Sequence, residues 1–253
     1  LRKHAKIEPE RFYYHCDRLG MLVWQDMVNG GSSYKHWFVT YLATLMNWTH
    51  ISFHDGPRHQ KLLSRGDEAG REEFLSEVDE TVSFLYNHPC IVVWVPFNEG
   101  WGQFDALSVT ERIHGLDPGR LIDHASGWFD QKGGDILSLH YYFFTLRFRP
   151  ENGRATALTE FGGYCLSLPE HAACPKTYGY RKFKTTAALT EGYKILLEQT
   201  ILPAARLGVG ATVYTQLSDI EEETNGIYTW DRKICKLDAA TILYYNNALK
   251  ELI

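Results

Sequence analysis

Residues 86–101 read Tyr-Asn-His-Pro-Cys-Ile-Val-Val-Trp-Val-Pro-Phe-Asn-Glu-Gly-Trp, and this stretch decides the fold. Its apolar and β-branched run from Ile91 to Phe97 ends abruptly on Asn98 and Glu99. Continuous hydrophobicity of this length is typical of a strand buried on both faces, as the strands of parallel sheets are. A carboxylate that follows such a strand occupies the place where α/β barrels carry their catalytic groups.

A second apolar stretch ends in the same way. Residues 155–163 read Ala-Thr-Ala-Leu-Thr-Glu-Phe-Gly-Gly, so that Glu160 closes this strand as Glu99 closes the first. A retaining glycosidase needs one protonated carboxylic acid and one ionised carboxylate, separated by about 5–5.5 Å. Separate strands of one barrel, directed to one end, supply such a separation. The sequence therefore predicts that Glu99 and Glu160 meet across one sugar-sized site.

The composition narrows the class of protein. The chain has 253 residues, of which 44% are hydrophobic and 23% charged, and this suits one large α/β domain with a substantial core. A net charge of −5 gives no basic surface for nucleic acid. No apolar run approaches the ~20 residues of a membrane span. The expected partner is a carbohydrate substrate, without nucleic acid or membrane.

Cysteine and histidine spacing argues against a metal or a disulfide. The five cysteines are scattered and lack the spacing of metal ligands, so we expect them to be free thiols. His50, His54 and His59 lie near Asp55 in one loop, but their spacing fits no zinc pattern. We therefore expect no metal site and no cofactor. The thiols fit a reducing compartment, and export remains the alternative.

Periodicity along the chain predicts alternating helices and strands. A helix is expected between Pro9 and Gly20, and another at 190–207 with Thr190 as its cap and Gly208 as its stop. Further helices are expected at 67–86, at 104–115 and from Asp238. Six strands are expected, at 21–27, 91–97, 120–125, 136–142, 155–161 and 210–217. Two long loops are expected at 28–66 and 163–189, the first with an amphipathic piece near 36–47.

This alternation predicts an α/β protein of the TIM (β/α)8 barrel type. Leu1-Arg2-Lys3-His4 reads as the end of a further strand, so the barrel lacks its first strand and most of its second. A barrel opened in this way exposes strand edges and apolar interior. We therefore expect residues 1–253 to be one catalytic barrel domain of a longer multidomain polypeptide, which could form homo-oligomers through its other domains.

Two motifs carry a resemblance to a known family. Asn87-His88-Pro89-Cys90 through Trp94, followed after three residues by Asn98-Glu99, resembles the acid/base motif of glycoside hydrolase family 2. Thr159-Glu160-Phe161-Gly162-Gly163 resembles its nucleophile motif. The resemblance covers nearly the whole chain and implies the family's catalytic barrel, with Glu99 as acid/base and Glu160 as nucleophile. It implies a retaining exo-β-glycosidase that hydrolyses terminal sugars and is similar to the β-galactosidases.

The resemblance extends to residues near the strand ends. Arg2 matches the Arg of an Arg-x-x-His element, and His4 lies one place before the position of the family's His. Tyr141 matches the position from which family members hydrogen-bond the nucleophile. Tyr214 and Gln216 fall where relatives line the sugar pocket.

Other candidate substrate contacts follow from residue chemistry. The amide of Asn98 is able to bond the hydroxyl beside the reacting carbon, and Trp101 suits stacking on a sugar face. Asp26 either binds a sugar hydroxyl or braces Arg2. His140 is either a substrate ligand or a histidine of the core rim. Two alternative functions stay open: a β-glucuronidase or β-mannosidase of the same family, and a non-catalytic carbohydrate-binding barrel.

Overall fold

The computed structural model describes residues 1–35, 37–49, 51, 53–142, 146 and 148–252. Over these residues the chain is an α/β protein with parallel strand pairing. It divides into two compact units. Unit 1 comprises Leu1–Leu139 and Glu151–Ala155, and unit 2 comprises His140–Pro150 and Thr156–Ile253.

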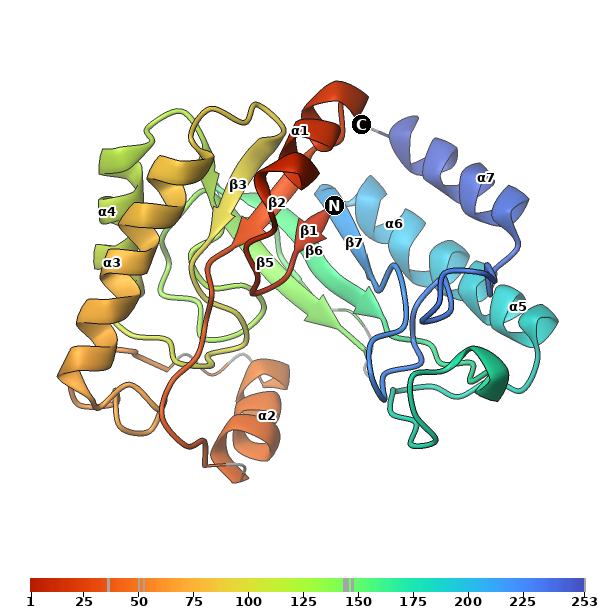
Figure 1. The fold of residues 1–253 in the computed structure, drawn as a ribbon, viewed down its shortest axis with the longest axis horizontal. Coiled ribbons are helices and arrows are strands. Elements are labelled where there is room, and N and C mark those ends of the chain that lie inside the picture. Colours follow the sequence, from red (N-terminus) through yellow and green to blue (C-terminus); the bar gives the residue numbers. More distant parts are fainter. Residues whose placement is uncertain (36, 50, 52, 143–145, 147, 253) are drawn as a thin grey trace. The chain divides into compact units, whose positions relative to one another are not determined.

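Unit 1 is built on a parallel sheet of four strands in the order β1-β2-β3-β4 (Figure 1). The strands are β1 (Arg2–Lys3), β2 (Val23–Asp26), β3 (Ile91–Val95) and β4 (Leu121–Ile122). In register, Trp24 of β2 lies opposite Arg2 on one side and Val93 on the other. The expected strands at 21–27, 91–97 and 120–125 are confirmed, and so is the strand end at the N-terminus.

Three helices pack on this sheet, and their ends follow from local chemistry. Helix α1 (Glu10–Leu19) ends at Gly20, whose φ of 63° is left-handed. Helix α3 (Glu68–Leu85) begins after Asp67, whose side chain accepts from Gly70 N at 2.7 Å. Helix α4 (Ala106–Leu116) lies beside α3 (Figure 1). Their apolar faces and the sheet form the core of unit 1, which includes Tyr13, Val23, Phe74, Val78, Val82, Trp94, Phe97, Val109, Ile113 and Ile122.

The segment 28–66 has structure of its own. It contains a π-helical turn η1 (Trp37–Leu42) followed by helix α2 (Ala43–Trp48). Phe38, Ala43 and Leu63 pack with Phe129 into a second, smaller core. The amphipathic piece expected near 36–47 is therefore helical, and it carries its own apolar contacts.

Unit 2 contains nearly all of strand β6 (Ala155–Gly162), strand β7 (Val209–Thr215) and the end of β5 (Ile136–Tyr141). The strand order is β5-β6-β7, and β6 pairs with β7 in parallel. A short 3-10 turn, η2 (Pro169–His171), lies in the long connection after β6. Two sheets are thus present in the described residues, and closure of a barrel stays a prediction.

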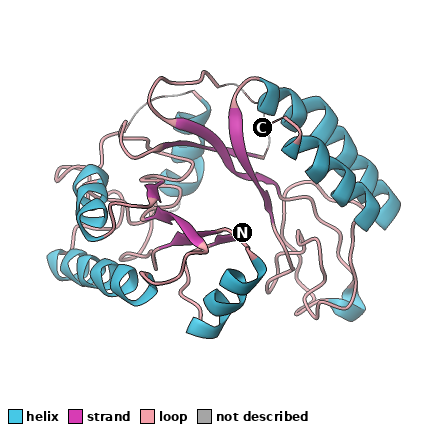
Figure 2. Cartoon of the chain, turned by 90° about the horizontal axis from the view of Figure 1, so that it is seen from above, coloured by secondary structure: helices cyan, strands magenta, loops and turns pink. Residues whose placement is uncertain are grey.

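A continuous helical run and the last helix lie side by side in unit 2 (Figure 2). The run is α5 (Thr186–Leu196), the π turn η3 (Leu197–Ile201) and α6 (Leu202–Arg206), and the last helix is α7 (Ala239–Lys250). The expected cap at Thr190 is wrong: α5 begins earlier, because the side chain of Thr185 accepts from Ala188 N at 3.1 Å. Thr190 lies inside the helix, where its hydroxyl accepts from Asp238 N at 3.2 Å.

Two expectations from composition can be compared with the structure. All five cysteines are free thiols, as expected. Among the described helices, none combines the length and the apolar character that crossing a bilayer requires.

Candidate active site

The parallel sheet of unit 1 places polar side chains at the C-terminal ends of its strands. Arg2 donates two hydrogen bonds to Asp26, from Nε to Oδ1 at 3.0 Å and from Nη2 to Oδ2 at 2.9 Å. The Nη2 of Arg2 also donates to Asn98 Oδ1 at 2.8 Å. Of the two roles considered for Asp26, the structure therefore shows that it braces Arg2. Because the Oδ1 of Asn98 accepts from Arg2, its Nδ2 is oriented as a donor for a hydroxyl group.

Charge pairing stabilises this network. The side chains of Arg2 and Asp26 are only 2% and 3% exposed, so their ion pair is sheltered from water. Burial by itself raises the pKa of Asp26, but the charge of Arg2 and hydrogen bonds from His4 and Arg2 outweigh it and lower that pKa. The Nδ1 of His4 lies 3.1 Å from Asp26 Oδ2, while its ring remains largely exposed. His4 therefore contacts the buried pair of Arg2 and Asp26 from solvent.

Glu99 lies in a tight turn, with three residues between it and the end of β3. Its backbone N–H donates to Ser126 O at 2.9 Å, and its φ of 51° is left-handed, which is uncommon for a residue with a side chain. Gly100 and Gly102 continue the turn with φ of 71° and 65°. A Cβ on Gly102 would lie 2.1 Å from Gly30 O, so glycine is required there.

The segment 28–66, which is long for a connection between a strand and a helix, holds this turn in place. Buried Arg65 donates from Nε to Gly102 O at 3.0 Å, and its guanidinium lies 4.9 Å from the ring centroid of Phe74. The side chain of Gln103 donates to Asp55 Oδ2 at 2.9 Å. Asp55 thus accepts a hydrogen bond from Gln103, the residue that follows the turn. His50 lies outside the described residues.

Trp101 is the aromatic side chain of the same turn. It is 37% exposed, and its ring centroid lies 4.7 Å from that of Tyr34. Its backbone oxygen accepts a hydrogen bond from the side chain of Asn29. Sugar stacking by Trp101 stays a prediction, for which this partly exposed indole offers one open face.

Asp123, which follows β4, is a fully buried carboxyl group that the sequence analysis did not select. Neither of its oxygens has a hydrogen-bond partner in the part of the chain that the structure describes. Burial raises its pKa to about 6, and the charge of Arg2 and the nearby hydroxyl of Ser138 offset this only in part. The rule that selected Glu99, a carboxylate after a strand, also applies to Asp123.

In unit 2, Glu160 is held by two side chains from the end of β5. The phenol of Tyr142 donates to Glu160 Oε2 at 2.5 Å, and the Nδ1 of buried His140 lies 3.5 Å from the same oxygen. The contact expected of Tyr141 therefore belongs to Tyr142. The reason is the two-residue period of extended chain, which directs His140 and Tyr142 to the same side and Tyr141 to the other.

Further contacts fix Tyr142 itself. Its hydroxyl lies 3.0 Å from Thr215 Oγ1 at the end of β7, and its ring packs on Tyr180 with centroids 4.2 Å apart. Gly163, with φ of 62°, allows this packing, because a Cβ there would lie 2.3 Å from the Tyr180 ring. Glu160 is thus oriented by a side chain that is itself supported from two directions.

Tyr214 does not have the role expected of it. Its ring packs edge-on against Phe161 and against Tyr193 of α5, each with centroids 5.4 Å apart, and burial raises the pKa of its phenol. The alternation along β7 directs Tyr214 to the helix side of the sheet and Thr215 toward Tyr142. Gln216, the next residue, donates from Nε2 to Glu223 Oε2 at 2.9 Å and to Asn225 Oδ1 at 2.7 Å.

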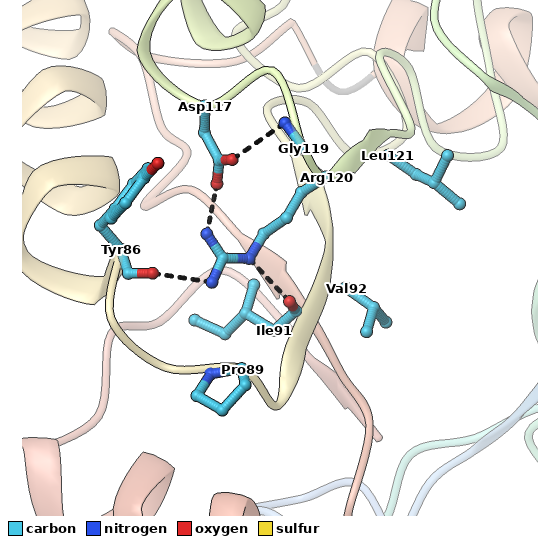
Figure 3. Close-up of a pocket in the computed structure, with 8 residues that line it drawn as sticks. All are labelled: Tyr86, Pro89, Ile91, Val92, Asp117, Gly119, Arg120 and Leu121. Atoms are coloured by element: carbon cyan, nitrogen blue, oxygen red, sulfur yellow. Dashed lines mark hydrogen bonds and ion pairs between the residues drawn. The ribbon is translucent and has the colours of Figure 1, made fainter.

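Unit 1 contains a cavity of about 530 Å³, whose lining includes Tyr86, Ile91 and Arg120 (Figure 3). It is lined by the starts of β3 and β4, whereas Glu99 follows the other end of β3. Arg120 donates there to the backbone oxygens of Ile91, Tyr86 and His88 and pairs with Asp117. Through these contacts Arg120 joins the starts of β3 and β4, at the opposite end of β3 from Glu99.

Comparison with known proteins gives a match at the level of structure. No family model and no curated protein matches the sequence. Among solved structures, a β-D-glucuronidase of Dictyoglomus thermophilum matches 98% of this chain with a TM-score of 0.63 and 14% identity. A family 2 β-galacturonidase of Eisenbergiella tayi matches 99% with a TM-score of 0.60 and 15% identity. A β-glucuronidase of Ruminococcus gnavus matches 98% with a TM-score of 0.59 and 14% identity.

The likeness is one of fold. The chain spans 44% of the length of each of these three structures. Within that span, nearly every residue of the chain has a structural counterpart. The chain therefore has an α/β fold like that found in β-glucuronidases and in a β-galacturonidase of glycoside hydrolase family 2.

Proposed function

We propose that this chain is the catalytic part of a retaining β-glycosidase of glycoside hydrolase family 2. The main support is the setting of Glu160 near the end of β6. The phenol of Tyr142 lies 2.5 Å from its carboxylate and the imidazole of His140 lies 3.5 Å away, and such contacts orient a carboxylate nucleophile. Glu99, in a strained turn beside the oriented amide of Asn98, supplies the second carboxyl group. The fold likeness supports the same assignment.

The proposed reaction has two steps. Glu160 attacks the anomeric carbon while Glu99 gives its proton to the departing oxygen, so that a glycosyl ester forms on Glu160 and the alcohol leaves. Glu99 then takes a proton from water, whose oxygen attacks the same carbon and releases Glu160. Asn98 donates to a hydroxyl of the sugar, and Tyr142 fixes one oxygen of Glu160 so that the other faces the sugar.

The proposed substrate is a carbohydrate with a terminal, non-reducing β-linked sugar, of the β-galactosidase type. β-Glucuronidase activity is the second candidate, because several fold neighbours carry that name. β-Mannosidase activity and assembly into homo-oligomers through further domains remain proposals that follow from the family motifs. A panel of nitrophenyl β-glycosides separates the three substrate types.

The test removes each carboxylate in turn. Glu160→Gln should lower kcat/KM on aryl β-glycosides by about 10³-fold or more, because the ester cannot form without the nucleophile. Glu99→Gln should lower kcat by about 10²- to 10⁴-fold, because water then lacks its general base. Glu111→Gln, on the exposed face of α4, is the matched control and should retain full activity. Circular dichroism should show an unchanged fold for all three variants.

Two results would contradict the assignment. One is undiminished turnover by Glu160→Gln. The other is a crystal structure with a bound sugar in which the carboxyl groups of Glu99 and Glu160 lie more than about 10 Å apart, since a retaining pair needs about 5–5.5 Å.

A further inference from the structure

Three tyrosine rings in unit 2 lead from the proposed nucleophile to the surface. Tyr142 donates from its hydroxyl to Glu160 at 2.5 Å, and the ring of Tyr180 packs on that of Tyr142 with centroids 4.2 Å apart. Tyr178 comes next, because its ring lies edge-on to that of Tyr180 with centroids 6.1 Å apart. Tyr178 is 50% exposed. We call Tyr142, Tyr180 and Tyr178 the tyrosine series. It joins the carboxylate of Glu160 to an aromatic ring that meets solvent.

The backbone that carries Tyr178 is held by another loop of unit 2. Tyr178 N donates to Glu222 O at 2.6 Å, and Thr224 N donates to Tyr178 O at 3.1 Å. The thiol of Cys165 donates to the same oxygen at 3.4 Å. The next residue is Gly179, where a Cβ would collide with that sulfur. Because these contacts fix the backbone, only the side-chain torsions of Tyr178 stay free, and its ring is presented at a defined place.

Tyr180 is tied to the end of the strand that carries the nucleophile. Its N–H donates to Gly163 O at 3.3 Å, three residues after Glu160. The ring of Tyr180 covers Gly163 and packs on Tyr142, as described above. The tyrosine series therefore keeps its position relative to Glu160.

An exposed ring at the end of this series suits the part of the substrate that departs. In the proposed reaction the terminal sugar reacts at Glu160, and the alcohol bonded to it is released to solvent. Tyr178 offers that alcohol a flat apolar face together with a polar hydroxyl group. A tyrosine has only two side-chain torsions, so its ring binds a ligand at a low cost in conformational entropy.

We propose that Tyr178 forms a binding site for the leaving group of the glycoside, an inference that rests on the proposed function. The leaving group is a ring, either an aryl group or a second sugar, whose face stacks on the Tyr178 ring. The site therefore favours glycosides of ring-bearing alcohols over glycosides of small alcohols such as methanol. Tyr178 adds selectivity on the side of the reacting bond that faces away from the terminal sugar.

The experiment varies the leaving group and keeps the sugar. The sugar is the one whose nitrophenyl β-glycoside the unsubstituted full chain hydrolyses fastest, and the substrates are its phenyl glycoside, its disaccharide with glucose and its methyl glycoside. Each variant is compared with the unsubstituted chain on the same substrate, so that differences in intrinsic reactivity cancel. Tyr178→Ala should lower kcat/KM on ring-bearing substrates by about 3- to 10-fold more than on the methyl glycoside, as expected for the loss of one stacked ring.

The two ring-bearing substrates identify the kind of leaving group. A loss confined to the phenyl glycoside assigns the site to an aryl group, and a loss confined to the disaccharide assigns it to a sugar. A loss on both assigns it to either ring. Each of these results supports a leaving-group site at Tyr178.

Two control variants separate stacking from a structural role. Tyr178→Phe keeps the ring and should keep the preference for ring-bearing substrates. Tyr244→Ala removes an exposed tyrosine of α7 that packs edge-on against Tyr245, and it should leave all three substrates unchanged. A structural role of Tyr178, exerted on the nucleophile through Tyr180 and Tyr142, would instead lower kcat/KM on the methyl glycoside as much as on the others.

The second step of the reaction gives an independent readout. An added alcohol competes with water for the glycosyl ester: its oxygen attacks the anomeric carbon, its proton passes to Glu99, and Glu160 is released as a carboxylate. The acceptor then occupies the place that the leaving group has vacated. Tyr178→Ala should lower transfer to benzyl alcohol, relative to transfer to methanol, by about 3- to 10-fold.

The outcomes distinguish this inference from the proposed function. If Tyr178→Ala changes kcat/KM by the same factor on all three substrates, or changes none of them, the inference is overturned while the glycosidase assignment stays intact. If the unsubstituted chain hydrolyses no glycoside of the panel, the proposed function fails and the leaving-group site fails with it.

Discussion

Tyr142 links the proposed nucleophile to the rest of unit 2, since its hydroxyl contacts Glu160 and Thr215 together. Tyr142→Phe removes the donor and keeps the ring that packs on Tyr180. We expect kcat/KM on aryl β-glycosides to fall about 10- to 100-fold, because a hydrogen bond to a charged group contributes about 1.5–3 kcal/mol. Thermal unfolding should change little. Tyr141→Phe is the control, and a loss of equal size there would return the role to Tyr141.

Because of buried Asp123, we expect the free energy of unfolding to fall as the pH rises, whereas most carboxyl groups have the opposite effect. Its pKa is raised from 3.8 to about 6 by burial, so the folded state holds a proton that the unfolded state releases earlier. The stabilisation is complete below about pH 4 and is lost as the pH rises through about 6. Asp123→Asn keeps the shape without the charge. At about pH 8 it should be more stable than the unsubstituted chain by up to ~3 kcal/mol, and at about pH 4 the two should be equal.

Urea unfolding across this pH range measures the effect. Asp117→Asn provides a comparison of opposite sign. Burial favours a raised pKa at Asp117, but hydrogen bonds from Arg120 and Trp94 outweigh it and lower that pKa. Its contribution is present above about pH 4 and lost at lower pH. A stability difference for Asp123→Asn that stays constant with pH would contradict the assignment of a buried, proton-holding carboxyl group.

At the scale of the element, the turn of residues 99–102 is constrained by the left-handed backbone of Glu99, Gly100 and Gly102. Gly102→Ala places a Cβ 2.1 Å from Gly30 O at a φ of 65°, so the turn must move. We expect kcat to fall by up to about 100-fold, since a displacement of about 1 Å in a catalytic group has that effect. Stability should fall by about 1–3 kcal/mol.

Gly115→Ala is the matched control for this substitution. Gly115 lies in α4, and a Cβ there meets no atom within 4 Å. Alanine should stabilise the helix by about 0.5–1 kcal/mol without changing activity. If kcat is the same for Gly102→Ala as for Gly115→Ala, the position of Glu99 does not depend on the turn.

Helices and strands were predictable where one local feature of the sequence, such as an apolar run or a capping residue, was unambiguous. Residues 91–97 are uniformly apolar and gave β3, and Asp238 and Asp67 cap the helices expected after them. Errors arose where two signals competed. Three threonines, Thr185, Thr186 and Thr190, lie just before or within α5, and only the contact with Ala188 identifies Thr185 as the cap. The facing of Tyr141 and Tyr142 depends on where β5 ends, and its end is not marked in the sequence.

At the scale of the whole molecule, sequence rules locate strand ends better than the partners that meet there. The rule that carboxylates follow parallel strands selected Asp26, Glu99 and Glu160. It left two roles open for Asp26, and only the structure shows the contact with Arg2, because this contact joins residues 24 positions apart. The hydrogen bond from Arg65 to the turn was not predictable from the sequence either, because the segment that carries Arg65 has the composition of a loop.

The buried ammonium of Lys236 has a consequence for engineering. Its Nζ donates hydrogen bonds to Leu166, Asp219 and Thr224. Asp219 and Thr224 flank the short stretch 220–223, so both ends of that stretch are held in place. Substitution of the side chains of Glu221 and Glu222 between them therefore leaves the three bonds of Lys236 in place. A library at Glu221 and Glu222 would therefore vary the surface of this loop while its backbone stays anchored at both ends.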